Sequence, residues 1–398
     1  MDVELTPKTR ERLLESIRLA CEWYVNCQNT KEHPWGGVHE SADYGRYIYE
    51  YFPKRQWCRG MGVWGQALAI MGLLTASKII RHEHFNCRQS ALTASGYLRT
   101  LQVMDQSNPI AYGALCEESP QSRYSYPRDA ATGAMGFIAL YRETGEEEWL
   151  HRATLFARWY HDYGSDKNGW PYCNYDFVKG SLDAERDLPL VKGDWQAGGG
   201  LVYYYLYRVT GEKLWLDYFR QLIDPLLEMY ERNFNVPVVP AGFHGEVEIT
   251  YGNDDFAIIA LLAAYRQWHE PRMLAALQTH IRRMWTIVDE DSSYPSLGGT
   301  FVCTINNHEY LKLCLEEKLT EDIPALKQRI VQSTLQGLTQ QETASTDLRA
   351  YGGFYGQSSY GVSRDRIHHR STGYALILNT RLVGEFTPYY SSWCWDKK

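Results

Sequence analysis

One helix–turn–helix pattern recurs in this chain and constrains its fold more than any other feature. Tyr141–Glu146 (YRETGE) returns as Tyr207–Glu212 (YRVTGE), each followed three residues later by a Trp-Leu pair, and a weaker copy begins at Tyr265. In each copy an apolar helix ends at a glycine or a short polar stretch, and a second helix begins. Such a repeated unit predicts an array of helix pairs.

Extending this unit along the chain predicts about six pairs in which outer and inner helices alternate. The outer helices carry charge on a face that should contact water, and they are expected at 8–27, 84–104, 146–163, 212–232, 271–289 and 321–341. The inner helices are richer in small residues and are expected at 60–78, 129–143, 194–209, 254–267, 307–318 and 371–383. Few strands are indicated, at Val236–Val239 and Glu246–Thr250. The pattern predicts an all-α (α/α)6 barrel, and without a Pro/Ser-rich linker we expect a single domain over residues 1–398.

Long loops precede the inner helices and are expected to gather at one rim of the barrel. They cover residues 28–58, 105–128, 164–193, 233–253, 290–306 and 342–370. Loops of this length in a compact domain are usually functional. The sequence therefore predicts a substrate pocket at that rim.

Composition narrows the classes of ligand. The 398 residues include 41 Lys and Arg against 48 Asp and Glu, and the net charge of −7 disfavours nucleic acid and anionic membranes as partners. The nine cysteines form no C-x-x-C pair and no metal-ligand spacing is present, so we expect free thiols, no metal and no cofactor. The 30 Tyr and 13 Trp suit either a surface that stacks on sugar rings or a core with wet edges.

Membrane and targeting signals are also missing from the sequence. No apolar run approaches the length of a membrane-spanning helix, and the first residues lack the apolar stretch of a signal peptide. The sequence therefore predicts a cytoplasmic protein, although a periplasmic chain trimmed of its signal would have the same features. It leaves the oligomeric state open.

Two aspartates at the starts of inner helices are the candidate catalytic residues. Asp129 and Asp194 each precede a glycine by four residues, Gly133 and Gly198, and so share a helix face with it. That face is the one needed for close packing toward the barrel axis. Two carboxyls on neighbouring helices can divide acid and base work, because repulsion and burial separate their pKa values. The alternative for each aspartate is a helix N-cap.

Other residues near the same rim are candidate substrate-binding groups. Arg59, Arg128 and Arg370 suit a bidentate grip on a substrate carboxylate, or ion pairs with nearby acids. His244, in a glycine-containing loop, suits a base or a hydrogen-bond donor. The remaining candidates are Asp254, His369 and the aromatic residues Trp57, Trp170, Trp195, Tyr126, Tyr251 and Tyr360, which suit stacking on sugar rings.

On these residues the chain resembles the unsaturated glucuronyl hydrolases and related β-glucuronidase-like glycoside hydrolases with an (α/α)6 barrel. In that family an Asp opens the second inner helix within an Asp-x-x-x-Gly-like stretch and another opens the third, which Asp129–Gly133 and Asp194–Gly198 match. A histidine in the loop after the third inner helix matches His244. The family's carboxylate-binding set of Arg and Gln has no clear counterpart here.

The resemblance implies an enzyme that removes a terminal, 4,5-unsaturated glucuronic acid residue from an oligosaccharide. In that chemistry an Asp protonates C4 of the sugar, water adds at C5, and the hemiketal collapses and releases the next sugar. The resemblance implies that Asp194 is this acid and base, while Asp129 holds the water or shares the proton.

Several alternatives use the same residues differently. A conventional exo-β-glucuronidase would use the same two carboxyls. A sugar 2-epimerase on this barrel would abstract a proton with His244, His368 or His369, and a polysaccharide lyase would use Tyr360 or His369 near Arg370. A non-catalytic carbohydrate-binding barrel would leave the acids as helix caps.

Overall fold

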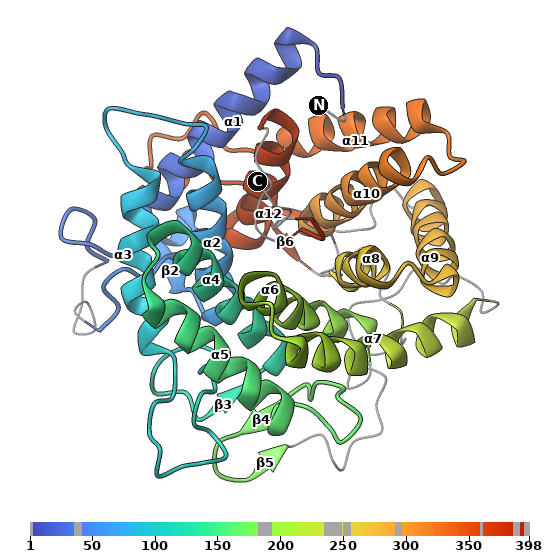
Figure 1. Cartoon of the computed structure of the whole chain (residues 1–398). Coiled ribbons are helices and arrows are strands. Elements are labelled where there is room, and N and C mark those ends of the chain that lie inside the picture. Colours follow the sequence, from blue (N-terminus) through green and yellow to red (C-terminus); the bar gives the residue numbers. More distant parts are fainter. Residues whose placement is uncertain are drawn as a thin grey trace. The chain divides into compact units, whose positions relative to one another are not determined.

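The chain divides into two compact units, whose helices and strands are labelled in Figure 1. Unit 1 comprises Met1–Thr100 and Ser296–Tyr389, and unit 2 comprises Leu101–Pro295 and Tyr390–Lys398. The structure, a computed structural model, describes residues 3–35, 42–181, 193–234, 249, 256–290, 297–358, 361–384 and 391–393. The expectation of a single domain stays a prediction.

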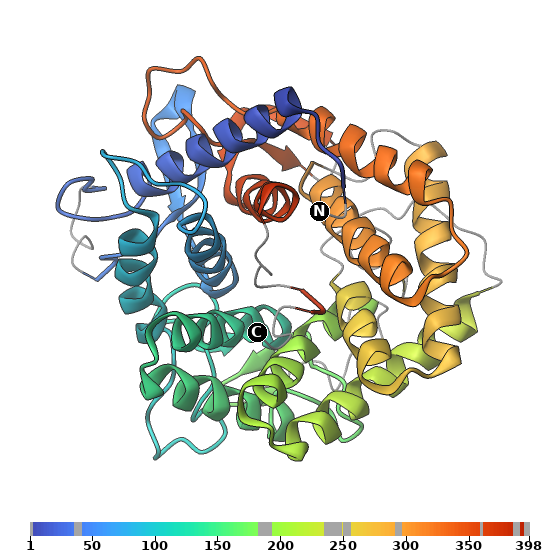
Figure 2. The same ribbon diagram turned by 45° about the horizontal axis from the view of Figure 1, so that its top comes forward.

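Unit 1 joins helices from both ends of the chain. They are α1 (Pro7–Asn26), α2 (Val63–Ala76), α3 (Cys87–Thr100), α10 (Leu297–Glu317), α11 (Ile323–Leu338) and α12 (His369–Val383). Helix α12 packs against α1, α2 and α10 (Figure 2). Because α2 and α12 are buried along their whole length while α1 exposes a charged face, the expected division into buried and water-facing helices holds here.

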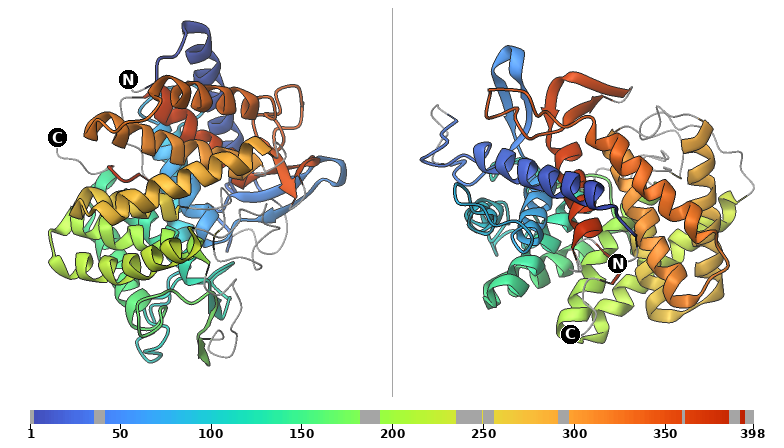
Figure 3. Two further views of the ribbon diagram at one scale, coloured as in Figure 1. Left: turned by 90° about the vertical axis from the view of Figure 1, so that its right-hand side faces the viewer. Right: turned by 90° about the horizontal axis from the view of Figure 1, so that it is seen from above.

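A four-stranded antiparallel sheet belongs to the same unit and was not expected from the sequence. Its order is β2 (Trp57–Gly60), β1 (Ile48–Phe52), β7 (Gly361–His368) and β6 (Tyr355–Ser358). Strand β1 is rich in β-branched and aromatic residues, which favour a pleated, half-buried surface. The two hairpins project beyond the helices of their unit (Figure 3).

Unit 2 is built from consecutive helices and a small sheet. The helices are α4 (Pro127–Thr144), α5 (Glu147–Asp162), α6 (Leu201–Thr210), α7 (Lys213–Asn233), α8 (Ala257–Trp268) and α9 (Pro271–Glu290), with a 3-10 helix η3 (Asp194–Gly200) leading into α6. Three short strands pair in the order β3 (Tyr124–Ser125), β4 (Tyr175–Asp176) and β5 (Gly180–Ser181).

The repeated sequence forms the same turn twice in unit 2. Gly145 follows α4 and Gly211 follows α6, both with a left-handed φ of 75° that glycine adopts without strain. Each glycine N–H donates to a tyrosine carbonyl, at 2.7 Å to Tyr141 and 2.8 Å to Tyr207. The repeat therefore encodes a helix end that leads directly into the next helix.

The expected helix ranges agree with the structure except at α10. Helix α10 begins at Leu297, so the predicted loop at 290–306 is wrong in its second half and residues 307–309 lie inside the helix. The expected strands at 236–239 and 246–250 lie outside the described residues, apart from Ile249. Among the residues described, no helix is both long and apolar enough to cross a membrane.

Candidate active site

The first turn of α4 places a charged pair at the start of a helix. Pro127 occupies the first helical position after the extended residue Tyr126, and Asp129 follows within the first turn, where the helix dipole favours a carboxylate. Arg128 Nη1 lies 3.0 Å from Asp129 Oδ1; the arginine is 3% exposed and the aspartate 29%. The N-cap position belongs to Tyr126, so the N-cap alternative for Asp129 is wrong.

Glu117 is a functional candidate that sequence reasoning missed. Its Oε2 accepts a hydrogen bond from the Tyr126 backbone N–H at 3.4 Å. Burial raises the pKa of Glu117 well above its ordinary value, and the negative charge of Asp129 raises it further. Glu117 and Asp129 thus form an electrostatically coupled pair of carboxyls, in which the pKa of the buried Glu117 is raised. In the sequence, Glu117 is one of two adjacent glutamates in a loop, and nothing distinguishes it.

Half-buried aromatic rings accompany this pair. The Arg128 guanidinium lies 6.0 Å from the ring centroid of Trp195, and the Tyr124 and Tyr126 rings are 5.3 Å apart. Burial, followed by the charge of Glu117, raises the pKa of Tyr126. Flat, partly exposed rings next to carboxyls suit a sugar ring, and Tyr126 and Trp195 were both predicted for this role.

Asp194 is more deeply buried than Asp129 and is linked to two outer helices. Its side chain accepts a hydrogen bond from the Tyr230 hydroxyl of α7 at 3.2 Å. The Tyr230 ring stacks on His280 of α9, with centroids 4.6 Å apart. Burial lowers the pKa of His280 to about 4, although the charge of Asp194 acts in the opposite direction. Gly193 is the N-cap of η3, so Asp194 does not cap it.

Gly199 allows the segments that carry Asp129 and Asp194 to pack closely against each other. Helix η3 packs against α4, as expected for neighbouring inner helices. A Cβ atom on Gly199 would lie 3.3 Å from Ala131 Cβ of α4 and would overlap the Tyr160 hydroxyl. The expected glycine, Gly198, instead faces Phe256, so the contact with α4 shifts by one residue from the prediction.

The start of α12 in unit 1 holds the second group of predicted residues. His368 is the N-cap, and its Nδ1 accepts a hydrogen bond from the Arg370 backbone N–H at 3.0 Å. His369 Nδ1 and the Tyr24 hydroxyl are 2.7 Å apart, while His369 Nε2 has no hydrogen-bond partner among the described residues. Burial lowers the pKa of His369 to about 3, and the Trp64 ring centroid lies 5.4 Å from the His369 ring. Arg370 is buried at the same place.

Three residues that were predicted near the rim of the pocket have other surroundings in the structure. Trp57 and Arg59 lie on strand β2, with exposed side chains, because the chain forms a hairpin before α2 begins. Trp170 is buried and its indole N–H donates to Gln196 Oε1 at 3.0 Å, which makes it a core residue of unit 2.

Four predicted residues lie outside the part of the chain that the structure describes. They are His244, Tyr251, Asp254 and Tyr360. Within the described ranges, no group of three or more His, Cys, Asp or Glu residues could hold a metal ion.

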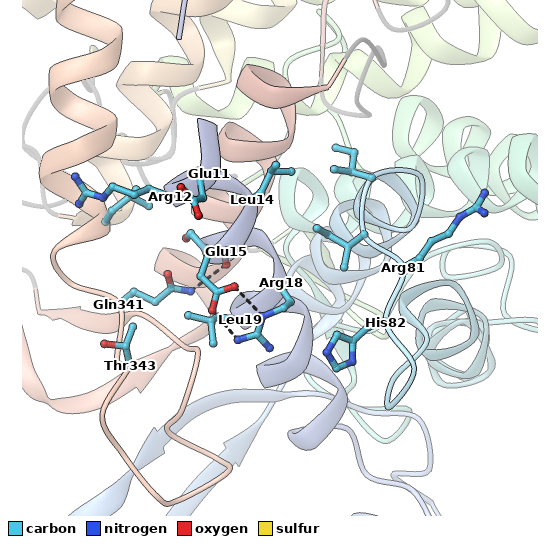
Figure 4. A pocket seen from close by; sticks show the side chains of 14 residues that line it. Glu11, Arg12, Leu14, Glu15, Arg18, Leu19, Arg81, His82, Gln341 and Thr343 are labelled. Atoms are coloured by element: carbon cyan, nitrogen blue, oxygen red, sulfur yellow. Dashed lines mark hydrogen bonds and ion pairs between the residues drawn. The ribbon is translucent and has the colours of Figure 1, made fainter. Parts of the chain in front are cut away.

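A cavity of about 770 Å³ lies beside α1 in unit 1 (Figure 4). It is lined mainly by residues of α1, the 79–82 segment and the 338–343 segment. Arg18 donates to Glu15 at 2.7 Å, and this bond lowers the pKa of the Glu15 carboxyl. The lining includes none of the predicted site residues that the structure describes, so the cavity carries no support for the predicted pocket.

Comparison with known proteins identifies the fold. A scan against protein-family models gives no match, and a search of the curated proteins gives none either. Solved structures do match over most of the chain. Cellobiose 2-epimerase from Bacillus thermoamylovorans has a TM-score of 0.65 at 12% identity, covering 94% of this chain and 99% of its own.

Hydrolases match over a similar share of the chain. The unsaturated glucuronyl hydrolase of Streptococcus agalactiae has a TM-score of 0.65 at 13% identity, covering 97% of this chain and 94% of its own. A family 76 glycoside hydrolase (mannosidase) from Bacteroides thetaiotaomicron has a TM-score of 0.59 at 13% identity, covering 95% and 98%. These likenesses show that the chain has the (α/α)6-barrel fold, which confirms the predicted fold class.

Proposed function

We propose that this chain is a glycoside hydrolase that removes a terminal glucuronic acid residue from an oligosaccharide. The observation that carries the proposal is the carboxyl pair of Glu117 and Asp129, in which burial and the charge of Asp129 raise the pKa of Glu117. Glycoside hydrolysis and the hydration of an unsaturated uronide both need a protonated acid and a carboxylate base. The fold is shared with an unsaturated glucuronyl hydrolase and a mannosidase, which supports the same class.

In this proposal the two carboxyls have separate roles. Asp129, the more exposed member, takes a proton from the attacking water, and the ion pair with Arg128 orients its carboxylate. Glu117 supplies the proton, which goes to C4 of a 4,5-unsaturated uronide while the water oxygen bonds to C5. The hemiketal then opens and releases the next sugar. On a saturated uronide the same proton would go to the leaving oxygen.

Asp194 is the alternative proton donor, as the resemblance to the unsaturated glucuronyl hydrolases implies. Its burial and its bond to Tyr230 favour a positioning role, in which it fixes the segment that presents Trp195. Comparing Glu117→Gln with Asp194→Asn distinguishes the two donors. The variant that loses turnover while the Michaelis constant is unchanged removes the proton donor.

The test of the proposal uses two substrates in parallel. One is a 4,5-unsaturated glucuronyl disaccharide, followed by loss of its ultraviolet absorbance, and the other is an aryl β-glucuronide. Loss of absorbance would establish the hydration chemistry, and aryl release alone would establish a conventional glucuronidase. If neither substrate is turned over, the proposal is wrong.

A second candidate function rests on the α12 histidines. His369 Nε2 is buried beside Trp64, without a hydrogen-bond partner in the described part of the chain, and a neutral imidazole there could accept a proton from a sugar carbon. A cellobiose 2-epimerase and a D-mannose isomerase share the fold. The low pKa of His369, about 3, makes it a weak base, which is why hydrolysis ranks first. Incubation with mannose or an N-acylhexosamine, analysed for the epimer, tests this candidate.

A further inference from the structure

One face of the four-stranded sheet in unit 1 gathers arginine and aromatic side chains. Residues paired across antiparallel strands lie on the same face, and the register pairs Glu50 with Arg59, Phe52 with Trp57, and Glu50 with His368. On the opposite face, Tyr51 and Ile367 are buried.

The arginines of this face lie over its aromatic rings. The guanidinium carbons of Arg55 and Arg366 are 5.6 and 6.0 Å from the centroid of the Phe52 ring. Arg59 lies in the same way 5.4 Å from the centroid of Tyr49. A guanidinium over an aromatic ring is attracted by the negative face of that ring. We call the set Tyr49, Phe52, Arg55, Trp57, Arg59 and Arg366 the hairpin face.

Charge on the hairpin face is opposite in sign to that of the whole chain. Its arginines are accompanied by the carboxylate of Glu50, which is buried and whose Oε2 lies 2.5 Å from Arg366 Nη1. Arg55 and Arg59 are exposed. The net charge of the chain is −7, so a surface with an excess of arginine is a local feature.

Trp57 gives this face a flat apolar platform. Half of its surface is exposed, and its ring lies 5.5 Å from that of Phe52, which holds it in place. A tryptophan exposed to this extent on a hairpin adds little to the core of its unit. Sugar rings bind to such platforms through their C–H faces, and arginine forks bind carboxylates.

We propose that the hairpin face is a binding surface for an acidic oligosaccharide, with a sugar ring on Trp57 and uronate carboxylates on Arg55 and Arg59. This inference rests on the proposed function for the choice of uronate as the ligand. It differs from that function because binding here requires neither Glu117 nor Asp129 and no bond is broken.

The experiment measures binding by calorimetry to a hexamer of β-linked glucuronic acid, with cellohexaose as the neutral probe. We expect the acidic hexamer to bind and Trp57→Ala to weaken its binding about tenfold, the loss of one stacking contact. Arg55→Ala should weaken binding and reduce its dependence on salt. Matched controls are Val178→Ala, an exposed apolar residue of unit 2, and Arg12→Ala, an exposed arginine of α1.

Each outcome has a defined meaning. Equal affinity of Trp57→Ala and wild type would overturn the inference, and so would equal binding of the neutral and acidic hexamers. Tight binding of a single-stranded oligonucleotide in place of the acidic hexamer would reassign the surface to nucleic acid and overturn it as well. Binding of the acidic hexamer is measured without turnover. An enzyme that is inactive but still binds the hexamer through Trp57 therefore contradicts only the proposed function and supports the binding surface. Thermal unfolding of each variant shows whether it is folded.

Discussion

Glu117 binds its proton more tightly in the folded chain than in the unfolded chain, because burial and the charge of Asp129 raise its pKa. This preference stabilises the fold at pH values below the ordinary pKa of about 4.5 and is lost as the pH rises through the raised value. The glutamine side chain of the Glu117→Gln variant does not titrate, so this contribution is absent from the variant. We therefore expect the melting temperature of wild type to fall relative to that of the variant as the pH rises above about 4.5.

The same variant should have little activity. Removing a general acid lowers kcat by about 10²- to 10⁴-fold, and the effect should exceed that of Glu118→Gln, its neighbour in the sequence. Steady-state kinetics on the substrate that wild type turns over measures the change. Near-normal turnover by Glu117→Gln would exclude it as the donor.

Asp129 should matter for activity more than for stability, since its side chain is partly exposed. Asp129→Asn is expected to lower kcat by about 10²-fold or more because it removes the base. Its melting temperature should change little. Asp217→Asn, on the exposed surface of α7, is the matched control and should leave both unchanged. An active Asp129→Asn would contradict the role given to this residue.

At the scale of single residues, part of the candidate site was predicted from the sequence. Asp129, Arg128, Tyr126 and Trp195 were predicted, and the structure brings them together because they flank the starts of two packed segments. Glu117 was missed because its special property comes from burial in the folded chain, which a loop sequence does not show.

At the scale of elements, the packing of η3 against α4 depends on Gly199. A methyl group there would overlap the Tyr160 hydroxyl and press on Ala131. We expect Gly199→Ala to reduce the free energy of unfolding by about 1–3 kcal/mol. Adding Tyr160→Phe, which removes the overlapping oxygen, should restore part of the loss.

The control for this prediction is a glycine in open space. At Gly96 in α3, no described atom lies within 4 Å of the position that a methyl group would occupy. Gly96→Ala should therefore be neutral or stabilise the helix by about 0.5–1 kcal/mol. Chemical denaturation measures both variants. Equal effects of the two substitutions would show that the close approach at Gly199 has no energetic role.

Helices were easier to predict than strands for a physical reason. The helix pairs carry a 3.6-residue apolar period and glycine ends that can be recognised locally, as at Gly145 and Gly211. Strands β1 and β7 pair residues from opposite ends of the chain, such as Glu50 with His368. Nothing local in either segment specifies that partner. Trp57 and Arg59 were expected at a helix start because the short hairpin of β1 and β2 was not recognised in the sequence.

At the scale of the whole molecule, several histidines are buried in the neutral form. Burial lowers the pKa of His280 to about 4 and of His308 and His369 to about 3, from an ordinary value near 6.5. Their contribution to stability is fully present above pH 6.5 and is lost as the pH falls toward 4. We expect unfolding free energies to decline between about pH 6.5 and 5, before most carboxylates titrate.

Two substitutions test whether the buried histidines cause this decline in the free energy of unfolding. His369→Gln should make the decline between about pH 6.5 and 5 shallower, because one proton-binding site is lost from the unfolded state. His84→Gln, at an exposed position, should leave the slope unchanged. The explanation is wrong if both variants keep the wild-type slope.

The contacts of α12 have a consequence for the order in which the chain can fold as it is synthesised. Helices α1, α2 and α3 are made before unit 2, yet α12, which packs against α1 and α2, begins only at His369, long after α3 ends at Thr100. Almost all of unit 2 is contiguous in the chain and needs no such delay. The apolar sides of α1 and α2 therefore remain without α12 until unit 2 has been synthesised, and we expect the nascent chain to need a chaperone most during this interval.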